Sequence, residues 1–225
     1  MNTSPELPGT GAPGSARRPI YKRWWFWVIA TPIILFIGLV IYRIPAVAEK
    51  ERTQQTVARI HAQKLTMNDV NGEHLPPPPD PAQVDATIEG VDANQNGIRD
   101  DVELAIFKKY PNSARIRAAE LQYAKALQLQ FTEVFSTGTF IAAIQEDGRG
   151  FGCIFETEPG HYPDFSRELA DQNKRINDRL DEVKNLILNT NERKSTYENN
   201  YDRYMTSFAT FRGQDCDLNV EIFPN

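Results

Sequence analysis

The twelve residues from Asp92 to Glu103 carry side chains that could together bind a metal ion. Their sequence is DANQNGIRDDVE. Oxygen-bearing side chains occupy positions 1, 3, 5, 9 and 12 of this segment, namely Asp92, Asn94, Asn96, Asp100 and Glu103, and Gly97 is at position 6. A loop with this spacing can wrap six or seven oxygens around one calcium ion, and the glycine permits the sharp bend that the loop needs.

The remaining positions of the segment complete the predicted calcium site. Ile98, at position 7, contributes a backbone carbonyl, and Asp100 binds directly or through a water. Glu103 binds with both carboxylate oxygens from the first turn of the following helix. Because two ligands are neutral asparagines and the sequence has no second such loop, we expect one structural ion, bound with an affinity on the order of 10⁻⁴ M or weaker. The alternative is that Asn96-Gly97 is only a turn and Asp100 only a helix cap.

Residues 24–42 form a run of 19 residues without a charged side chain. As a helix this run would be close to 30 Å long, enough to cross the hydrocarbon core of a bilayer. Four basic residues precede it, Arg17, Arg18, Lys22 and Arg23. The positive-inside rule therefore predicts that residues 1–23 form a cytoplasmic tail. Residues 1–16 are rich in Pro, Gly, Ser and Thr, so this tail is predicted to be disordered. A signal peptide cleaved after Ala48 is the alternative, since Ala46-Val47-Ala48 matches the small-x-small cleavage pattern.

The part of the chain after residue 42 is acidic. Of the 25 basic and 30 acidic residues, all but four basic residues and Glu6 follow the apolar run, which leaves 21 against 29. An acidic exported domain is poorly suited to nucleic acid, so we predict no nucleic-acid partner.

Cys153 and Cys216 both lie in the predicted exported part, where a disulfide can form. They lack the close spacing of redox or zinc-binding cysteines. We predict a structural disulfide, which would stabilise the fold by roughly 4 kcal/mol in the chain-entropy model. Two buried free thiols are the alternative.

Helical periodicity dominates from Asp100 onward. We predict a first helix over 100–110, capped by Asp100 and ended by the following proline. A second helix should start at Asn112 or Ser113 and run to about Glu146. Residues 147–163 contain four glycines and two prolines and are predicted to form a loop.

Two stripes follow in one helical register, an apolar one over 169–187 and an aromatic one over 197–211. The sequence allows one helix of nearly 50 residues or a hairpin that turns at Asn189–Asn191. A disulfide favours the hairpin, because the ends of a single helix would lie roughly 70 Å apart, whereas disulfide geometry requires Cα atoms within about 7 Å. The aromatic stripe then belongs to the core, with a carbohydrate- or lipid-binding surface as the alternative.

The predicted fold class is therefore all-α: a single N-terminal transmembrane helix followed by an extracytoplasmic antiparallel bundle of three long helices with one calcium loop. The predicted parts are a tail (1–23), a transmembrane helix (24–42), a juxtamembrane helix and linker (43–74), a proline-rich strap (75–91) and the calcium loop with the bundle (92–225).

The LPPPPDP strap and the NQNGIRDDVE loop, within the stretch that starts at Lys64 and continues through the helix after residue 113, resemble those of a group of bacterial envelope proteins. The loop is EF-hand-like. With Ile98 at position 7 and Arg99 at position 8, it is similar to the calcium loops of thrombospondin type 3 repeats. The resemblance covers about a third of the chain and implies a Gram-negative envelope protein. Together with the predicted transmembrane helix and its basic flank, this predicts a single-pass protein of the bacterial inner membrane with a periplasmic C-terminal domain.

The resemblance supplies no activity, and the sequence carries no recognisable catalytic signature. We expect a non-enzymatic interaction or scaffold protein that is anchored in the inner membrane through residues 24–42 and binds a protein partner in the envelope. A periplasmic immunity or inhibitor protein is the alternative, and a cell-wall hydrolase is a third hypothesis.

Overall fold

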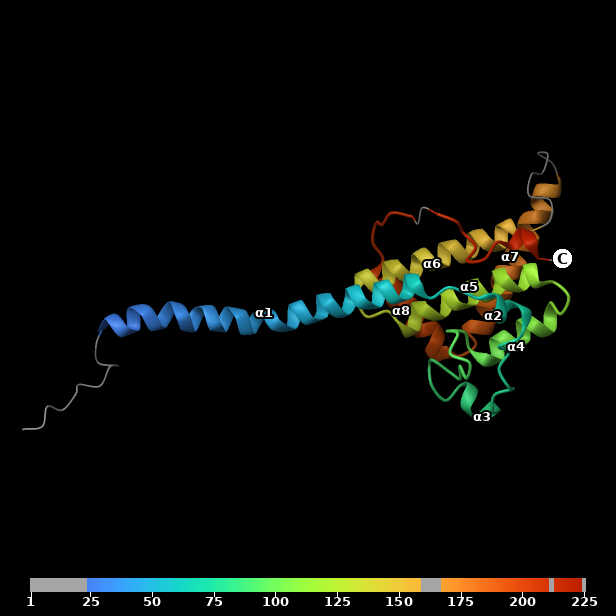
Figure 1. Cartoon of the computed structure of the whole chain (residues 1–225). Coiled ribbons are helices and arrows are strands. Elements are labelled where there is room, and N and C mark those ends of the chain that lie inside the picture. The colour runs from blue at the N-terminus through green and yellow to red at the C-terminus, as the bar shows by residue number, and fades with distance from the viewer. Residues whose placement is uncertain (1–23, 159–166, 211–212, 224–225) are drawn as a thin grey trace, which may run out of the picture. The chain divides into compact units, whose positions relative to one another are not determined.

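The computed structural model describes residues 24–158, 167–210 and 213–223, and every regular element in these ranges is a helix. This confirms the all-α fold class. The helices are α1 (Trp24–Ala62), α2 (Met67–Asn71), α3 (Pro81–Val84), α4 (Asp100–Lys109), α5 (Ala114–Thr132), α6 (Thr137–Glu156), α7 (Arg167–Ile187), α8 (Asn191–Tyr204) and the short 3-10 helix η2 (Val220–Ile222). The chain forms two compact units, residues 1–49 and 50–225 (Figure 1).

The described part of the first unit, residues 24–49, belongs to helix α1. This helix is long and apolar enough to cross a membrane, and its apolar side chains are exposed. Pro32 and Pro45 lie inside it, which transmembrane helices tolerate better than soluble ones. The helix continues without a break to Ala62, so the predicted transmembrane and juxtamembrane helices are one element. The predicted tail, residues 1–23, lies outside the described residues.

Helix α5 is the centre of the second unit. Every residue from Arg117 to Phe131 is buried, although many of them are polar. Helices α2, α4, α6, α7, α8 and η2 all pack against it, and α6 returns alongside it after the chain reverses at residues 133–136 (Figure 1). The bundle is therefore built around one central helix rather than from three equivalent ones.

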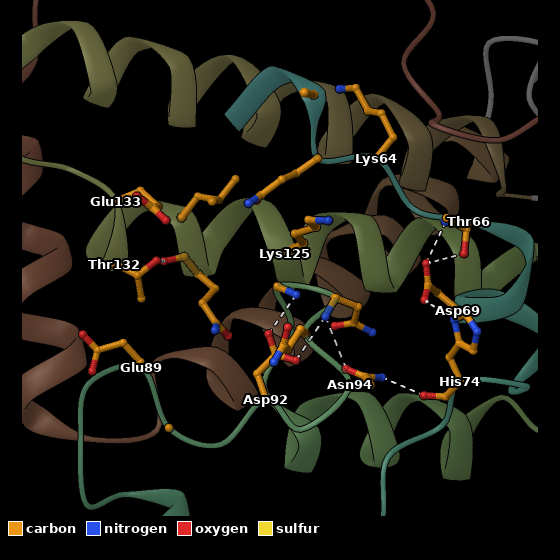
Figure 2. Close-up of a pocket in the computed structure, with 18 residues that line it drawn as sticks. Lys64, Thr66, Asp69, His74, Glu89, Asp92, Asn94, Lys125, Thr132 and Glu133 are labelled. Atoms are coloured by element: carbon orange, nitrogen blue, oxygen red, sulfur yellow. Dashed lines mark hydrogen bonds and ion pairs between the residues drawn. The ribbon is translucent and has the colours of Figure 1, made fainter. Parts of the chain in front are cut away.

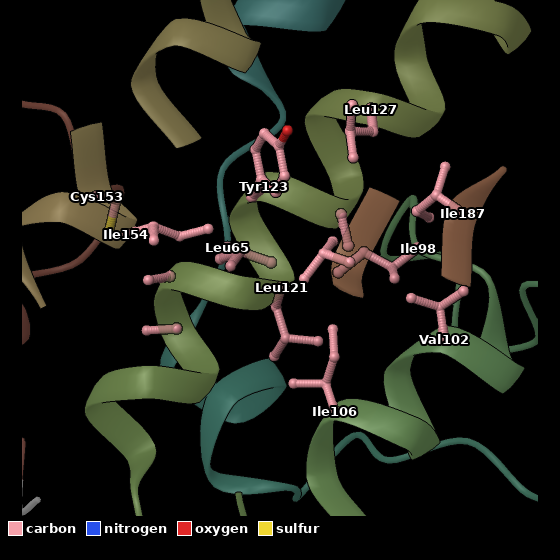
Figure 3. Packing of buried hydrophobic residues seen from close by; sticks show 14 of the residues in the cluster. Leu65, Ile98, Val102, Ile106, Leu121, Tyr123, Leu127, Cys153, Ile154 and Ile187 are labelled. Carbon is pink, nitrogen blue, oxygen red and sulfur yellow. The ribbon is translucent and has the colours of Figure 1, made fainter. Parts of the chain in front are cut away.

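The hydrophobic core joins the predicted metal loop to the helices. Ile98 from the loop packs with Val102 of α4, Leu121 and Leu127 of α5, and Ile187 of α7. Figure 3 shows these side chains converging between the helices. The loop is thus fixed to the core by an apolar anchor as well as by its polar groups.

The start of the central helix was predicted correctly, but its end was not. Ser113 caps α5, and its hydroxyl accepts a hydrogen bond from the Ile116 amide at 3.2 Å. The predicted helix to Glu146 is wrong, because the chain forms two helices separated at residues 133–136. Ser136 begins α6 with a capping box that includes Thr139, and this local start signal overrides the continuous apolar period.

The predicted cap of α4 is also wrong. Arg99 is the N-cap residue and makes no side-chain capping bond, while Asp100 is the first helical residue. The Asp100 carboxylate instead accepts a hydrogen bond from the Ala93 amide at 3.0 Å. This acid therefore closes the preceding loop rather than capping the helix.

The glycine-rich segment predicted as a loop is helical as far as Glu156. Gly148, Gly150 and Gly152 all lie inside α6. A β-carbon at Gly150 would lie 2.8 Å from the Tyr123 Cα of α5, so the missing side chain is what lets the two helix backbones approach. A β-carbon at Gly148 would meet nothing within 4 Å. Gly150, one of the glycines that suggested a flexible loop, thus allows α5 and α6 to pack closely.

Because a side chain fits at Gly148 but not at Gly150, alanine substitutions at these two positions form a matched pair of variants. Gly150→Ala should destabilise the fold by about 1–3 kcal/mol, because the added methyl group overpacks the α5–α6 interface. Gly148→Ala, two residues away on the same helix, should stabilise it by up to about 1 kcal/mol through helix propensity alone. Chemical unfolding of the full chain in detergent micelles would measure both. Equal effects of the two substitutions would contradict this account of the interface.

The C-terminal helices break where predicted but do not form a hairpin. Helix α7 ends at Ile187 and α8 begins after Thr190, whose hydroxyl accepts a hydrogen bond from the Arg193 amide. Both helices pack against α5 and α6 rather than along each other, so the hairpin prediction is wrong. The segment after Tyr204 instead brings Cys216 to Cys153, and the predicted disulfide is present with a Cα–Cα distance of 4.7 Å.

Only part of the two predicted stripes is core. Ile176, Val183 and Ile187 of the first stripe are buried, whereas Leu169 is 36 % exposed. In the aromatic stripe, Tyr197 packs against the core and Tyr201 is 44 % exposed. Phe208 lies beyond the end of α8, and Phe211 is outside the described residues. The early end of α8 explains why the stripe does not continue as one helical face.

Candidate functional site

The loop from Asp92 to Glu103 has the backbone shape that its glycine predicted. Gly97 has a φ of 85°, and Gln95 also has a positive φ of 57°. On the inner side of the loop, the Arg99 amide donates to Gln128 Oε1 of α5 at 3.1 Å. With the Ile98 side chain fully buried, the loop is held against the central helix from within.

Two asparagines of the predicted ligand set converge on Glu103. The Nδ2 groups of Asn94 and Asn96 donate to Glu103 Oε2 at 3.0 and 3.1 Å. The Asn96 side-chain oxygen accepts the Ile98 amide at 2.9 Å. These three side chains, predicted from spacing alone, therefore lie together.

The two aspartates of the set organise the loop backbone. The Asp92 carboxylate accepts the amides of Asn96 and Gly97 at 3.2 and 2.9 Å. Its position is fixed at the start of the loop, while Asp100 accepts the Ala93 amide from the other end. Because both carboxylates accept hydrogen bonds from backbone amides of the loop, their oxygens lie on the inside of the turn.

Glu103 is the least satisfied acid of the loop. Its side chain is fully buried, and Oε1 has no hydrogen-bond partner among the described residues. Burial raises the pKa of Glu103 to about 7, and the nearby Asp69 and Asp100 carboxylates add to this, while the two asparagine hydrogen bonds oppose it. A buried carboxylate oxygen without a partner is costly unless a proton or a cation reaches it.

The chemistry of this donor set fits a hard divalent cation. Within the described residues no three His, Cys, Asp or Glu side chains are grouped as metal ligands. The loop offers a different mixture, in which acids are combined with two amide side chains, and oxygen donors of this kind suit calcium rather than zinc. A cation beside Glu103 Oε1 would keep that carboxylate ionised and would favour rotation of the two amides toward their oxygens.

Arg99 ties the loop to the end of helix α7. The side chain is fully buried, and its guanidinium forms two 2.7 Å contacts with the Asp101 carboxylate. It also donates to the backbone carbonyls of Leu186 and Ile187 at 2.9 and 3.1 Å. These are the last carbonyls of the helix, which lack partners within it.

Arg193 holds the segment that precedes the loop in the same manner. It is fully buried at the start of α8. Its guanidinium donates to the carbonyls of Val84, Thr87 and Ile88 at 2.8 to 3.0 Å. It also contacts Asp85 Oδ1 at 2.6 Å and thereby lowers the pKa of that carboxyl.

A polar cavity of about 580 Å³ lies against the loop. The residues that line it come from the end of α1, from residues 63–74 that include α2, from residues 89–97, and from α5 with the residue that follows it. Figure 2 shows them. The labelled residues with ionisable side chains among them are Lys64, Asp69, His74, Glu89, Asp92, Lys125 and Glu133. One wall of this cavity is therefore the predicted metal loop itself.

Lys125 of α5 projects into this cavity beside Gly97 (Figure 2). Only 6 % of its surface is exposed, and its ammonium has no hydrogen bond or ion pair with any described residue. Burial lowers the pKa of Lys125, while the carboxylates of Asp217, Asp69 and Asp92 oppose the shift. No motif or spacing in the sequence singles out this lysine.

No family model, curated protein or solved structure matches the chain.

The sequence predicted the loop residues but not what holds them. Asp92, Asn94, Asn96, Asp100 and Glu103 lie in one loop as predicted, and the predicted use of the Ile98 carbonyl stays a prediction. Arg99 and Arg193 were not recognised as structural residues. The one available signal was Arg99 at a loop position where an aliphatic residue is usual. Nothing local in the sequence pairs Arg193 with residues more than 100 positions away.

Removing the Arg193 guanidinium should destabilise residues 84–88, the segment that precedes the loop and that Arg193 holds through three carbonyls. Arg193→Met keeps much of the side-chain volume but leaves three carbonyls without donors, and it should destabilise the fold by about 3 kcal/mol. Lys194→Met, at the exposed neighbouring position, should change stability by less than about 0.5 kcal/mol. Thermal unfolding of both variants would measure this. A small effect at Arg193 would show that the segment is held by other contacts.

Proposed function

We propose that this chain is a membrane-anchored interaction protein whose extracytoplasmic helical domain is fastened by one calcium ion. In this proposal α1 anchors the chain in a bacterial inner membrane, with residues 1–23 in the cytoplasm and the helical domain in the periplasm. The basic residues before the apolar stretch and the disulfide after it support this orientation.

The observation that carries the calcium proposal is that Glu103 Oε1 has no hydrogen-bond partner among the described residues. A buried acid without a local cation would normally be avoided, yet this one lies at the position where a calcium loop needs a carboxylate with both oxygens available. Asp92, Asn94, Asn96 and Asp100 supply further oxygens on the same loop. When bound, the ion would supply positive charge to these groups and hold the entry to α4.

The role of the ion in this proposal is structural. The loop contacts α5 through Gln128 and α7 through Arg99, so ordering the loop stabilises the junction of these helices. A protein partner in the envelope would then meet a domain whose helices are held together by the ordered loop. This favours an interaction role over a calcium switch, which would need a second, alternative arrangement of the helices.

Calcium should raise the melting temperature of the protein. With a Kd near 10⁻⁴ M, 10 mM calcium would stabilise the fold by about 2.7 kcal/mol, which corresponds to a rise of roughly 5–10 °C for a domain of this size. Asp92→Ala should abolish the rise, whereas Asp171→Ala, at an exposed position on α7, should retain it. The measurement is thermal unfolding of the full chain in micelles with calcium or EDTA. An unchanged melting temperature, or an equal rise in Asp92→Ala, would refute the calcium site.

The effect of calcium should also depend on pH near neutrality. Because the pKa of Glu103 is about 7, a proton competes with the ion, and calcium affinity should fall about fivefold between pH 7 and pH 6. Without calcium, the stability of the fold should change with pH in the opposite direction. In this pH range the folded protein holds a proton on Glu103 that the unfolded chain has lost, so the free energy of unfolding should fall as pH rises from about 5 to 7. Titration calorimetry and unfolding of the wild type and Glu103→Gln would test both trends. A carboxylate of ordinary pKa would show neither in this range.

A further inference from the structure

The cavity beside the loop contains the ammonium group of Lys125, which pairs with none of the described residues. Four other polar residues buried on α5 each bind another part of the chain. Arg117 donates to the Val70 carbonyl, Glu120 pairs with Arg179, Gln122 bonds the backbone of residues 215 and 217, and Gln128 accepts the Arg99 amide. Lys125 lies among them on the same helix and binds no described residue.

The carboxylates nearest to Lys125 are already engaged by other donors. Asp69 Oδ2 accepts both the amide and the hydroxyl of Thr66 at 2.7 Å. Asp92 accepts two loop amides, and Asp217 contacts Arg149 Nη2 at 2.7 Å. Lys64, the other lysine that lines the cavity, lies 2.9 Å from Glu146 Oε2. Within the described residues, Lys125 is therefore the cavity cation that is left for a ligand.

The surroundings of Lys125 favour a singly charged group over a phosphate. Three carboxylates lie close enough to affect its titration, and they would repel a dianion more strongly than a monoanion. Phosphate sites usually gather several cationic or amide donors, whereas this cavity has one available ammonium. A carboxylate matches that single charge.

The rest of the cavity suits a polar ligand with a positive end. Glu89 is exposed at its edge and has no ion-pair partner among the described residues. Thr66, Thr132 and Gln63 add hydroxyl and amide groups to the lining. The cavity volume is within the range of small-molecule sites and is large enough for a few amino-acid residues.

We propose that this cavity binds a short zwitterionic peptide, with its carboxylate on Lys125 and its ammonium toward Glu89. The site goes beyond the calcium proposal, since the loop wall is held by Ile98, Arg99 and its own hydrogen bonds. Lys125 is the anchor of the ligand, and the loop supplies the adjoining wall.

Tri-alanine is a suitable probe, because it carries one carboxylate and one ammonium on a small backbone. Isothermal titration of the full chain in micelles should give a Kd of about 1 mM or tighter. Tri-alanine amide, which lacks the carboxylate, should bind the wild-type protein at least tenfold more weakly. N-acetyl-tri-alanine, which lacks the ammonium, should bind a few-fold more weakly.

The matched variants are Lys125→Met and Lys108→Met, the second at an exposed position on α4. The first should weaken tri-alanine binding at least tenfold without lowering the melting temperature, because it replaces an unpaired buried charge. The second should change neither quantity. No binding of tri-alanine at 20 mM, or equal binding of the acid and the amide by the wild type, would overturn the proposal. The comparison of the two peptides needs no variant, so it decides the question even if Lys125→Met fails to fold.

Discussion

The guanidinium groups of Arg99 and Arg193 hold the non-helical segment before α4 against the junction of α7 and α8, and both groups are fully buried. Between them they donate to five backbone carbonyls. A short polar segment cannot bury enough apolar surface to order itself, so its shape has to come from such contacts. The loop, the break between α7 and α8, and one wall of the cavity all depend on these two side chains.

The central helix α5 also carries buried polar side chains that bind other parts of the chain. A helix buried on all sides is usually apolar all round, yet α5 carries arginine, glutamate, lysine and glutamine among its buried residues. Three of these side chains, Arg117, Gln122 and Gln128, form hydrogen bonds with backbone groups of segments between the helices. The helix thus organises the linker, the metal loop and the C-terminal segment at once. This explains how a bundle with long connections can be well packed, and it makes the unused Lys125 conspicuous.

Local signals in the sequence predicted much of this structure. The apolar run of α1, the Ser113 cap, the break near Thr190, the disulfide and the shape of the loop all follow from spacing within a few residues or from the cysteine count. The predictions from sequence were wrong where a residue's role depends on a contact with a distant part of the chain. Gly150 suggested a flexible loop because its packing partner, Tyr123, lies in another helix. The hairpin was favoured because the sequence did not show that the chain returns after Tyr204.

In the candidate site, too, the features set by neighbouring residues could be predicted, whereas those set by contacts between distant residues could not. Its oxygen-bearing residues lie within one loop and could be predicted from their order. Arg193 and Lys125 belong to distant helices, and their roles depend on the three-dimensional arrangement that brings a helix to the loop. The cavity could not be predicted for the same reason, because its walls come from four separate parts of the chain.

The central claim is that the loop is folded in advance around the position of a cation. Anomalous diffraction from crystals of the full chain grown with calcium would test it most directly. The account predicts one ion at 2.3–2.6 Å from both Glu103 carboxylate oxygens and from oxygens of Asp92, Asn94, Asn96 and Asp100, with the Arg99 and Arg193 contacts unchanged. A loop without an ion, in which Glu103 Oε1 is met only by a proton or a water, would contradict it.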